Sequence, residues 1–197
     1  MIGIIDYGAG NIRSVANALG RLGADHFISS ESRELAKADK LIFPGVGEAR
    51  SAMDALAERN LTQWLGEVSV PFLGICLGMQ LLFDHTTERD TKCLQIIPGV
   101  NNRFSSSDKE LKVPHMGWNQ VEHRNDQPLF AGIASGEYFY FVHSYYAPLT
   151  EATIGTTEYG TQFTSALRRK NYYGVQFHPE KSGRIGLQLL KNFIELC

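Results

Sequence analysis

One five-residue stretch, Gly74-Ile75-Cys76-Leu77-Gly78, most constrains how this chain can fold. The apolar run 70–75 before the cysteine predicts a buried strand, and the run 79–83 after it predicts a helix. A cysteine between two glycines at such a turn is the thiol form of the G-x-S-x-G nucleophile elbow. The glycines permit close strand–helix approach, and the helix N-terminus favours a thiolate. The pattern therefore predicts a nucleophile, and a buried core cysteine is the alternative that these residues leave open.

Strands and helices alternate through the first half of the chain. Asn11 is a suitable N-cap for the first helix, and Gly23 is a suitable C′ residue. Alternation of this kind implies a mostly parallel sheet covered on both faces, with functional sites at the carboxyl ends of its strands. Because Pro44-Gly45-Val46-Gly47 and Cys76 both follow strands, we expect them to be neighbours. The predicted elements are strands at 1–6, 26–28, 40–43 and 70–75, and helices at 12–22, 32–37 and 48–59.

The second half of the chain has a different pattern of predicted elements, with many strand-like segments and few helices. It contains a polar loop at 101–112 and a final amphipathic helix at 183–196, and no linker or internal repeat. We therefore expect a single α/β domain over residues 1–197. Its central sheet is mostly parallel and flanked by helices, with an added antiparallel or mixed sheet in the C-terminal half. The predicted strands of this half are 94–97, 118–121, 138–143, 153–157, 163–168 and 172–177.

Bulk properties exclude several classes of protein. The 197 residues are 43% hydrophobic and 20% charged, as in ordinary globular proteins. A net charge of -2 gives no electrostatic case for binding nucleic acid or an anionic membrane. No apolar run approaches the ~20 residues that span a bilayer, and the first residues do not resemble a signal peptide. The cysteines Cys76, Cys93 and Cys197 form no disulfide framework, which fits a reducing cytoplasm.

A second chemical signal is the turn His178-Pro179-Glu180, which follows an apolar strand. Pro179 ends the strand and can fold the Glu180 carboxylate back toward the imidazole. With Cys76 these residues would supply a nucleophile, a base and an orienting carboxylate. A histidine hydrogen-bonded in a loop and a metal site are the alternatives, but no ligand cluster at recognisable spacing supports a metal. The glycine turn 7–10 lacks the phosphate-loop pattern, so we expect neither a nucleotide site nor a cofactor.

Taken together, the cysteine elbow and the His-Pro-Glu turn resemble the class I, triad-type glutamine amidotransferases. The resemblance narrows to the glutaminase subunits of imidazole glycerol phosphate synthases. Glu48-Ala49 departs from that pattern, since relatives commonly carry a small residue and an aromatic there. The departure leaves the triad untouched and leaves open a paralogue that serves another pathway. The matching motifs cover nearly the whole chain and lie at 5–11, 44–47, 74–83, 114–119, 142–146 and 174–183.

The resemblance implies that Cys76 attacks the side-chain amide carbon of glutamine, and that His178 delivers a proton to the leaving ammonia. Glu180 is implied to fix the imidazole tautomer, and water then hydrolyses the glutamyl thioester. The backbone N–H of Leu77 is one oxyanion donor by elbow geometry. The resemblance implies a second donor, the Val46 N–H after a peptide rearrangement, although a plain turn is the alternative for that loop.

The resemblance also implies where the substrate lies. Glu88 is suited to the α-ammonium group of glutamine, although on sequence alone Gln80 and Glu88 would be solvated helix residues. The residues implied to line the glutamine pocket are Gly47, Gln80, Glu88, Ser144 and Tyr145.

A partner is implied as well, since ammonia released into water becomes mostly ammonium and loses its nucleophilicity. The resemblance implies a (β/α)8-barrel cyclase that forms a heterodimer with this chain and receives ammonia through its interior. The cyclase would make imidazole glycerol phosphate for histidine synthesis and aminoimidazole carboxamide ribotide for purine synthesis. The residues implied at that interface are Asn11, Met116, Trp118, Tyr140 and Lys181, for which ordinary surface packing is the alternative.

Three other functions stay open on the sequence alone. They are a paralogous glutaminase that feeds another acceptor, such as one in sugar modification, a stand-alone cysteine hydrolase of γ-glutamyl substrates, and a catalytically silent binding module. The presence of Cys76, His178 and Glu180 argues against a silent module. The segments 116–118 and 181–182 argue against a stand-alone hydrolase.

Overall fold

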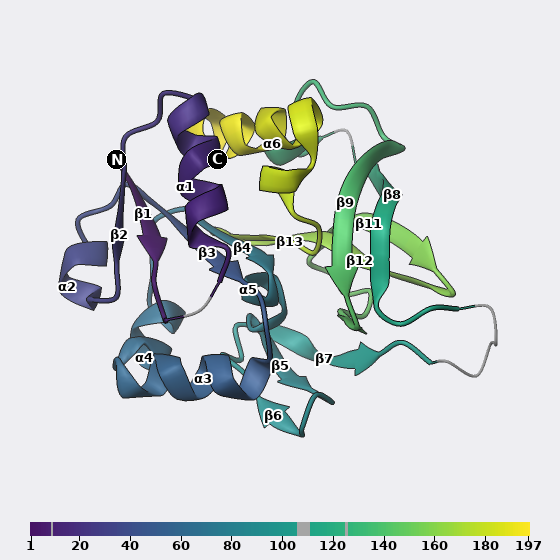
Figure 1. The fold of residues 1–197 in the computed structure, drawn as a ribbon, viewed down its shortest axis with the longest axis horizontal. Coiled ribbons are helices and arrows are strands. Elements are labelled where there is room, and N and C mark those ends of the chain that lie inside the picture. The colour runs from purple at the N-terminus through teal and green to yellow at the C-terminus, as the bar shows by residue number, and fades with distance from the viewer. Residues whose placement is uncertain (9, 106–110, 125) are drawn as a thin grey trace.

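A large mixed sheet runs through the computed structural model, which describes residues 1–8, 10–105, 111–124 and 126–197. Among these residues the strand order is β2-β1-β3-β4-β13-β12-β11-β8-β9 (Figure 1). The first five strands in this order are mutually parallel, and the remaining four are antiparallel. The parallel strands are β1 (Ile2–Ile5), β2 (His26–Ser29), β3 (Lys40–Gly45), β4 (Phe72–Cys76) and β13 (Tyr172–Val175).

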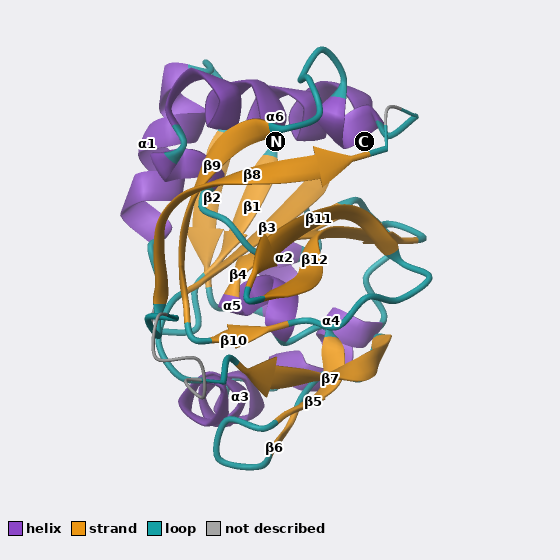
Figure 2. Ribbon diagram, turned by 90° about the vertical axis from the view of Figure 1, so that its right-hand side faces the viewer, coloured by secondary structure: helices purple, strands orange, loops and turns teal. Residues whose placement is uncertain are grey.

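The antiparallel strands extend the same sheet, so the predicted parallel centre with an added antiparallel part is confirmed. They are β8 (His115–His123), β9 (Glu137–His143), β11 (Thr153–Tyr159) and β12 (Thr161–Arg169). A smaller sheet lies next to the helix α3 (Ala49–Glu58; Figure 2) and has the order β10-β7-β5-β6. Its strands are β5 (Phe83–Thr86), β6 (Thr91–Lys92), β7 (Ile97–Arg103) and β10 (Tyr145–Tyr146).

Helices cover both faces of the parallel strands, as expected for βα alternation (Figure 1). Helices α1 (Ile12–Arg21) and α6 (Gly183–Leu196) cover one face. The opposite face is covered by α2 (Ser32–Leu35), α3 (Ala49–Glu58) and α4 (Leu61–Gly66). Alternate residues of β3 enter the two cores: Ile42 packs in the core with α1 and α6, whereas Leu41 and Phe43 pack in the other. Among the described residues, no helix is long and apolar enough to span a membrane.

Two sequence predictions about the middle of the chain are wrong. The run 79–83 does not continue as a helix, because α5 (Leu77–Gln80) is a single turn and β5 begins at Phe83. The run 94–97 is not a strand, because Gln95 is left-handed at φ 57° and the strand β7 begins only at Ile97. The N–H groups of Leu94 and Ile96 bond instead to the carbonyls of Leu81 and Leu82.

Other differences concern boundaries. Residues 101–103 of the predicted polar loop belong to β7, and 106–110 lie outside the described residues. The sequence does not predict the helix α4 or the strands β5, β6 and β10. Short 3-10 turns also occur at η1 (Pro128–Phe130) and at η2 (Pro179–Lys181), which contains Glu180.

Candidate active site

Cys76 lies at the carboxyl end of β4, in the sharp turn that the sequence predicts. Its backbone has φ 54° and ψ -110°, a strained conformation for a residue with a side chain. The flanking glycines are required sterically: a Cβ on Gly78 would lie 2.0 Å from the Phe43 carbonyl oxygen, and one on Gly74 would lie 2.6 Å from that of Gly78. Strand and helix therefore meet in backbone contact, and the turn between them places the buried cysteine at the carboxyl end of β4.

The helix that follows the cysteine is shorter than the sequence predicts. Since α5 has only the four residues Leu77–Gln80, its macrodipole is much weaker than that of a full helix. What the turn does supply is backbone N–H groups that lack intrahelical partners, beginning with the N–H of Leu77. The electrostatic help expected for the Cys76 thiolate therefore has to come mainly from side chains around the sulfur.

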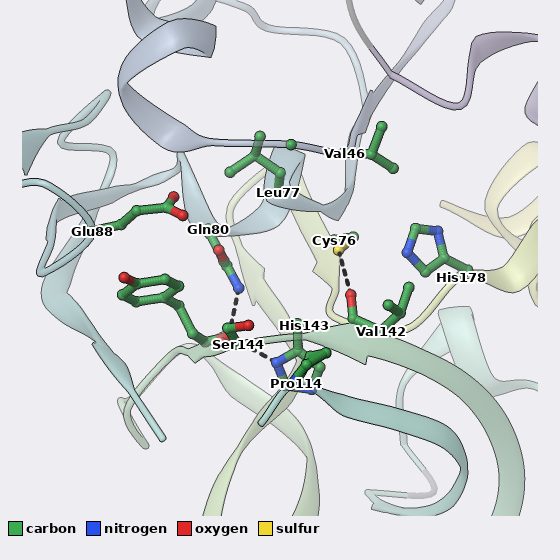
Figure 3. A pocket seen from close by; sticks show the side chains of 12 residues that line it. Val46, Cys76, Leu77, Gln80, Glu88, Pro114, Val142, His143, Ser144 and His178 are labelled. Atoms are coloured by element: carbon green, nitrogen blue, oxygen red, sulfur yellow. Dashed lines mark hydrogen bonds between the residues drawn. The ribbon is translucent and has the colours of Figure 1, made fainter. Parts of the chain in front are cut away.

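His178 and Glu180 form a buried pair beside the cysteine. Nδ1 of His178 lies 2.8 Å from Oε1 of Glu180, and the two side chains are 1% and 0% exposed. Among the described residues Nε2 of His178 has no hydrogen-bond partner, and the ring faces Cys76 (Figure 3). Burial opposes the charged imidazolium, but the negative charges of the Cys76 thiolate and Glu180 outweigh it and raise the pKa of His178 well above its ordinary value.

Asn11 completes this arrangement from the other end of the chain. Its Nδ2 donates to Oε1 of Glu180 at 2.7 Å. The residue occupies the predicted N-cap position of α1, but its side chain makes no capping hydrogen bond. The amide is directed at the carboxylate instead, so one carboxylate oxygen accepts from both Asn11 and His178. Two donors on a single oxygen fix the orientation of the Glu180 carboxylate.

Two groups that the sequence did not predict lie against the Cys76 sulfur. The thiol is 3.8 Å from the Val142 carbonyl oxygen, and Nε2 of Gln176 lies 3.6 Å from Sγ. Gln176 lies in the matching segment 174–183 and two residues before His178, and residues two apart in an extended chain share a face. Val142 begins the matching segment 142–146, but its contact with the sulfur is made by its backbone carbonyl and depends on the placement of β9.

A cavity of about 290 Å³ opens beside the sulfur. This is near the lower end of the ~300–1,000 Å³ common for small-molecule sites, and it suits a ligand the size of an amino acid. Glu88 and His178 lie at opposite ends of it (Figure 3). Its lining includes all the residues predicted for the oxyanion hole and the substrate pocket, namely Val46, Gly47, Leu77, Gln80, Glu88, Ser144 and Tyr145.

Glu88 is anchored by the helix that borders the cavity. One carboxylate oxygen accepts the N–H of Ala49, the first residue of α3, at 2.8 Å. Burial raises the pKa of Glu88, the Ala49 hydrogen bond lowers it, and the nearby Glu48 charge raises it, with an upward shift as the net result. A half-buried carboxylate that gains from a nearby positive charge is a natural partner for an ammonium group.

The loop after β3 begins level with the nucleophile. Gly45 pairs with Cys76 in the parallel register of β3 and β4, so the two strand ends predicted to be neighbours do meet. Val46 follows on this loop, half exposed, and its carbonyl oxygen lies 3.5 Å from the Tyr7 hydroxyl. The loop and the first turn of α5 therefore border the same side of the cavity.

Known proteins share both the sequence and the fold of this chain. Residues 3–196 match the model of the family described as glutamine amidotransferase class-I. The chain belongs to that family. It is 49% identical to the imidazole glycerol phosphate synthase subunit HisH of Methanocaldococcus jannaschii, over 100% of both chains. It is 47% identical to the protein of the same name from Mannheimia succiniciproducens, over 98% of each chain.

Solved structures agree on the fold of this class-I amidotransferase. The structure of PurLQS from Thermotoga maritima superposes with a TM-score of 0.74 at 17% identity. The match covers 98% of this chain and 96% of that one.

Among the residues that the structure describes, no group of three or more His, Cys, Asp or Glu side chains is arranged to hold a metal ion.

Three of the residues predicted for the partner interface, Met116, Trp118 and Tyr140, lie on the paired strands β8 and β9. Met116 and Trp118 are exposed on β8, and the rings of Trp118 and Tyr140 lie 6.1 Å apart. The carbonyl of Tyr140 accepts the N–H of His178 at 2.9 Å, which ties this face to the catalytic turn. Lys181 is exposed directly after Glu180. Tyr138, which is 52% exposed, lies on the neighbouring β9.

Proposed function

We propose that this chain is the glutaminase subunit of an imidazole glycerol phosphate synthase. It hydrolyses glutamine to glutamate and ammonia, and residues 1–197 act as one amidotransferase domain. The observation that carries this proposal is the buried Glu180–His178 pair facing Cys76 at a strained elbow. Nearly full-length identity of 47–49% to synthase subunits supports the choice of pathway.

Cys76, His178 and Glu180 divide the chemistry between them. The Sγ thiolate attacks the amide carbon of glutamine, and as the tetrahedral species collapses the C–N bond breaks. His178 gives its Nε2 proton to the departing nitrogen, because an amide nitrogen cannot leave as an anion. Water then attacks the thioester, with His178 taking up the proton, and glutamate leaves. Glu180 holds Nδ1–H of the imidazole, so that Nε2 is the nitrogen that exchanges protons.

The ends of the cavity define how glutamine lies in it. The α-ammonium group binds Glu88, and the side chain extends toward the sulfur at the other end. Gln80 contributes its side-chain carbonyl oxygen to the pocket, since its side-chain Nε2 already donates to Tyr145 and Gln176. Gly47, Ser144 and Tyr145 complete the enclosure. This arrangement selects an amino acid whose amide lies at the correct distance from its charged end.

The oxyanion is stabilised by backbone donors. The N–H of Leu77 is one, and the N–H of Val46 becomes the second when the peptide after Gly45 rotates. Both residues line the cavity, and Gly45 pairs with Cys76, which supports this pairing of donors. Loss of one such donor costs about 10²–10³ in kcat.

The partner is a (β/α)8-barrel cyclase that docks on the face formed by Met116, Trp118, Tyr140 and Lys181, with Asn11 at its margin. A cytoplasmic heterodimer of this kind receives ammonia before water protonates it. The exposed aromatic and apolar side chains of β8 and β9 support a protein-binding face.

Steady-state glutamine hydrolysis by the purified chain, with and without the cyclase and its ribonucleotide ligand, tests the proposal. We expect docking to raise kcat by about 10² or more with little change in KM, because an added oxyanion donor acts in the transition state. Equal kcat in both conditions would favour the stand-alone hydrolase of γ-glutamyl substrates. Stable association with another synthase in place of the cyclase would favour a paralogue.

A further inference from the structure

A buried side-chain amide, that of Gln176, lies beside the Cys76 sulfur. Gln176 follows β13 and is fully buried, with its backbone N–H bonded to the Ser165 carbonyl. Its side chain lies between Cys76 and Gln80: Nε2 is 3.6 Å from Sγ of Cys76, and Oε1 is 2.8 Å from Nε2 of Gln80. Because both ends of this buried amide are engaged, its orientation is defined. That orientation decides whether the sulfur faces the NH2 donor or the carbonyl oxygen.

The surrounding hydrogen bonds determine which end of the Gln176 amide faces the sulfur. Nε2 of Gln80 lies 2.7 Å from the Tyr145 carbonyl oxygen, which can only accept, so Gln80 presents its NH2 group there. The second hydrogen of that NH2 group goes to Gln176. Gln176 must therefore accept with its oxygen, and its NH2 group is left to face Cys76.

The Tyr145 carbonyl is itself held by a pair of buried histidines. It accepts from Nδ1 of His143 at 2.7 Å, and Nε2 of His143 lies 2.9 Å from Nδ1 of His115. Nε2 of His115 lies 3.2 Å from Nδ2 of Asn119, which can only donate. The Tyr145 carbonyl at one end can only accept and the Asn119 amide nitrogen at the other can only donate, so each imidazole carries its proton on Nδ1 and accepts on Nε2. The carbonyl that accepts from Gln80 thus ends a chain of hydrogen bonds that all run in the same direction.

We propose that Gln176 is a positioning residue that stabilises the Cys76 thiolate by donating an N–H to Sγ, with its amide polarity imposed by Gln80. The inference rests on the proposed role of Cys76 as the nucleophile. It supplies from a side chain the electrostatic support that the single-turn helix α5 is too short to give. It also gives Gln80 a second role, since that residue orients Gln176 in addition to lining the cavity.

Site-resolved alkylation of Cys76 by iodoacetamide across pH ~5–9 tests the proposal without requiring turnover. Gln176→Met keeps the length of the side chain but removes the donor, and Gln176→Glu does the same where its carboxyl is ionised. We expect Gln176→Met to slow alkylation of Cys76 about tenfold at acidic pH, and we expect both variants to move its pH–rate profile upward. Gln162→Glu, the same change on the exposed surface of β12, is the matched control and should keep the wild-type profile. Mass spectrometry separates Cys76 from Cys93 and Cys197.

The variant Gln80→Met tests the orientation of the Gln176 amide separately from the packing around the sulfur. The Gln80 side chain makes no hydrogen bond to the sulfur, but its loss leaves the Gln176 amide free to flip. We therefore expect Gln80→Met to slow Cys76 alkylation, as the Gln176 variants do. A wild-type pH–rate profile in folded Gln176→Glu and Gln176→Met would overturn the proposal. Failure of the proposed function would look different, because Cys76 of the wild-type chain would then react no faster than an ordinary buried thiol.

A measurement on the wild-type chain covers the case in which the Gln176 variants do not fold. In ¹⁵N-labelled protein, the side-chain N–H resonances of Gln176 should move as Cys76 ionises and should stay constant with pH in Cys76→Ala. Resonances that do not respond to Cys76 would overturn the donor role, whatever the variants do.

Discussion

At the residue scale, the Glu180 carboxylate is held by two donors on one oxygen. His178 and Asn11 reach Oε1 at 2.8 Å and 2.7 Å, whereas Oε2 has no hydrogen-bond partner among the described residues. The carboxylate cannot rotate without breaking both bonds. It therefore holds the imidazole with Nδ1 protonated and with Nε2 directed toward Cys76, the tautomer that proton transfer to a leaving group requires.

Substitution of the nucleophile is the first prediction at this scale. We expect Cys76→Ser to reduce glutamine hydrolysis below a tenth of wild type while fold and partner binding persist, because oxygen changes the volume little but removes the acidic nucleophile. Cys93→Ser and Cys197→Ser are the controls and should remain active. Burial, with the nearby Glu88 charge, raises the pKa of Cys93 to about 12, so this thiol is a poor nucleophile. A diazo-oxo-norleucine adduct found on Cys93 or Cys197 would contradict the assignment.

Asn11 gives a second prediction. Asn11→Leu keeps the size of the side chain but removes the donor to Glu180, and a hydrogen bond to a charged group is worth about 1.5–3 kcal/mol. We expect kcat in the partner complex to fall roughly 10–100-fold, less than for His178→Asn. Titration of the partner separates this effect from docking. Wild-type kcat together with weakened partner binding would assign Asn11 to the interface alone.

At the element scale, β8 presents different chemistry on its two faces. Met116 and Trp118 point outward, whereas His115 and Asn119 point inward to the hydrogen-bonded chain that ends at Tyr145. His115 is stacked between Tyr159 and Phe141, with ring centroids 4.0 Å and 4.9 Å away. One strand thus joins the exposed face that we assign to the partner with the hydrogen bonds behind the substrate cavity.

The buried histidine pair makes stability depend on pH. Burial lowers the pKa of His115 to about 4. Burial also lowers the pKa of His143, to about 3, together with the nearby charges of His115 and His178, although the Tyr145 hydrogen bond opposes this shift. In the unfolded chain histidine titrates near ~6.5, so below that pH the unfolded state binds more protons. The stabilisation is therefore complete above pH ~6.5 and is lost as pH falls toward about 4, by roughly 2 kcal/mol for His115 at pH ~5.

Thermal unfolding of His115→Gln checks this expectation. The variant should lose less Tm than wild type between pH ~7 and ~5, because one titrating group has been removed from the interior. His26→Gln, which replaces a half-buried histidine on β2 outside the pair, is the comparison variant. Identical pH dependence in His115→Gln and wild type would mean that the imidazole of His115 does not stay neutral in the fold.

At the scale of the whole molecule, the exposed apolar face and the cavity lie next to each other. Trp118 is 56% exposed, and Met116, its neighbour on the same face of β8, pairs in register with Val142, whose carbonyl reaches the Cys76 sulfur. Trp118→Ala should raise the Kd for the cyclase about 30-fold or more, since buried tryptophans at interfaces often contribute about 2 kcal/mol or more. Labelling of Cys76 by diazo-oxo-norleucine should persist. Leu149→Ala, which changes an apolar loop residue that is 49% exposed, is the control for binding measured by calorimetry.

The sequence predicts those parts of the molecule that depend on local patterns. The elbow, the βα alternation and the final helix follow from apolar spacing and glycine positions within about ten residues. The smaller sheet was missed because its boundaries depend on hydrogen bonds between 81–83 and 94–97. The contact of Asn11 with Glu180 joins residues 169 positions apart, and the contact of Gln176 with Cys76 joins residues 100 apart. No local pattern carries such contacts, since they arise from strand order.

That strand order also determines at which stage of chain synthesis the site can form. The last described strand in the chain, β13, lies in the middle of the large sheet, between β4 and β12. A growing chain therefore cannot finish its sheet by adding strands outward, and β4 must wait for a neighbour that is synthesised about a hundred residues later. His178 and Glu180 arrive with the same segment. A nascent or shortened chain that ends before β13 has the cysteine but lacks its base and one of the two strands that flank β4, so it cannot consume glutamine.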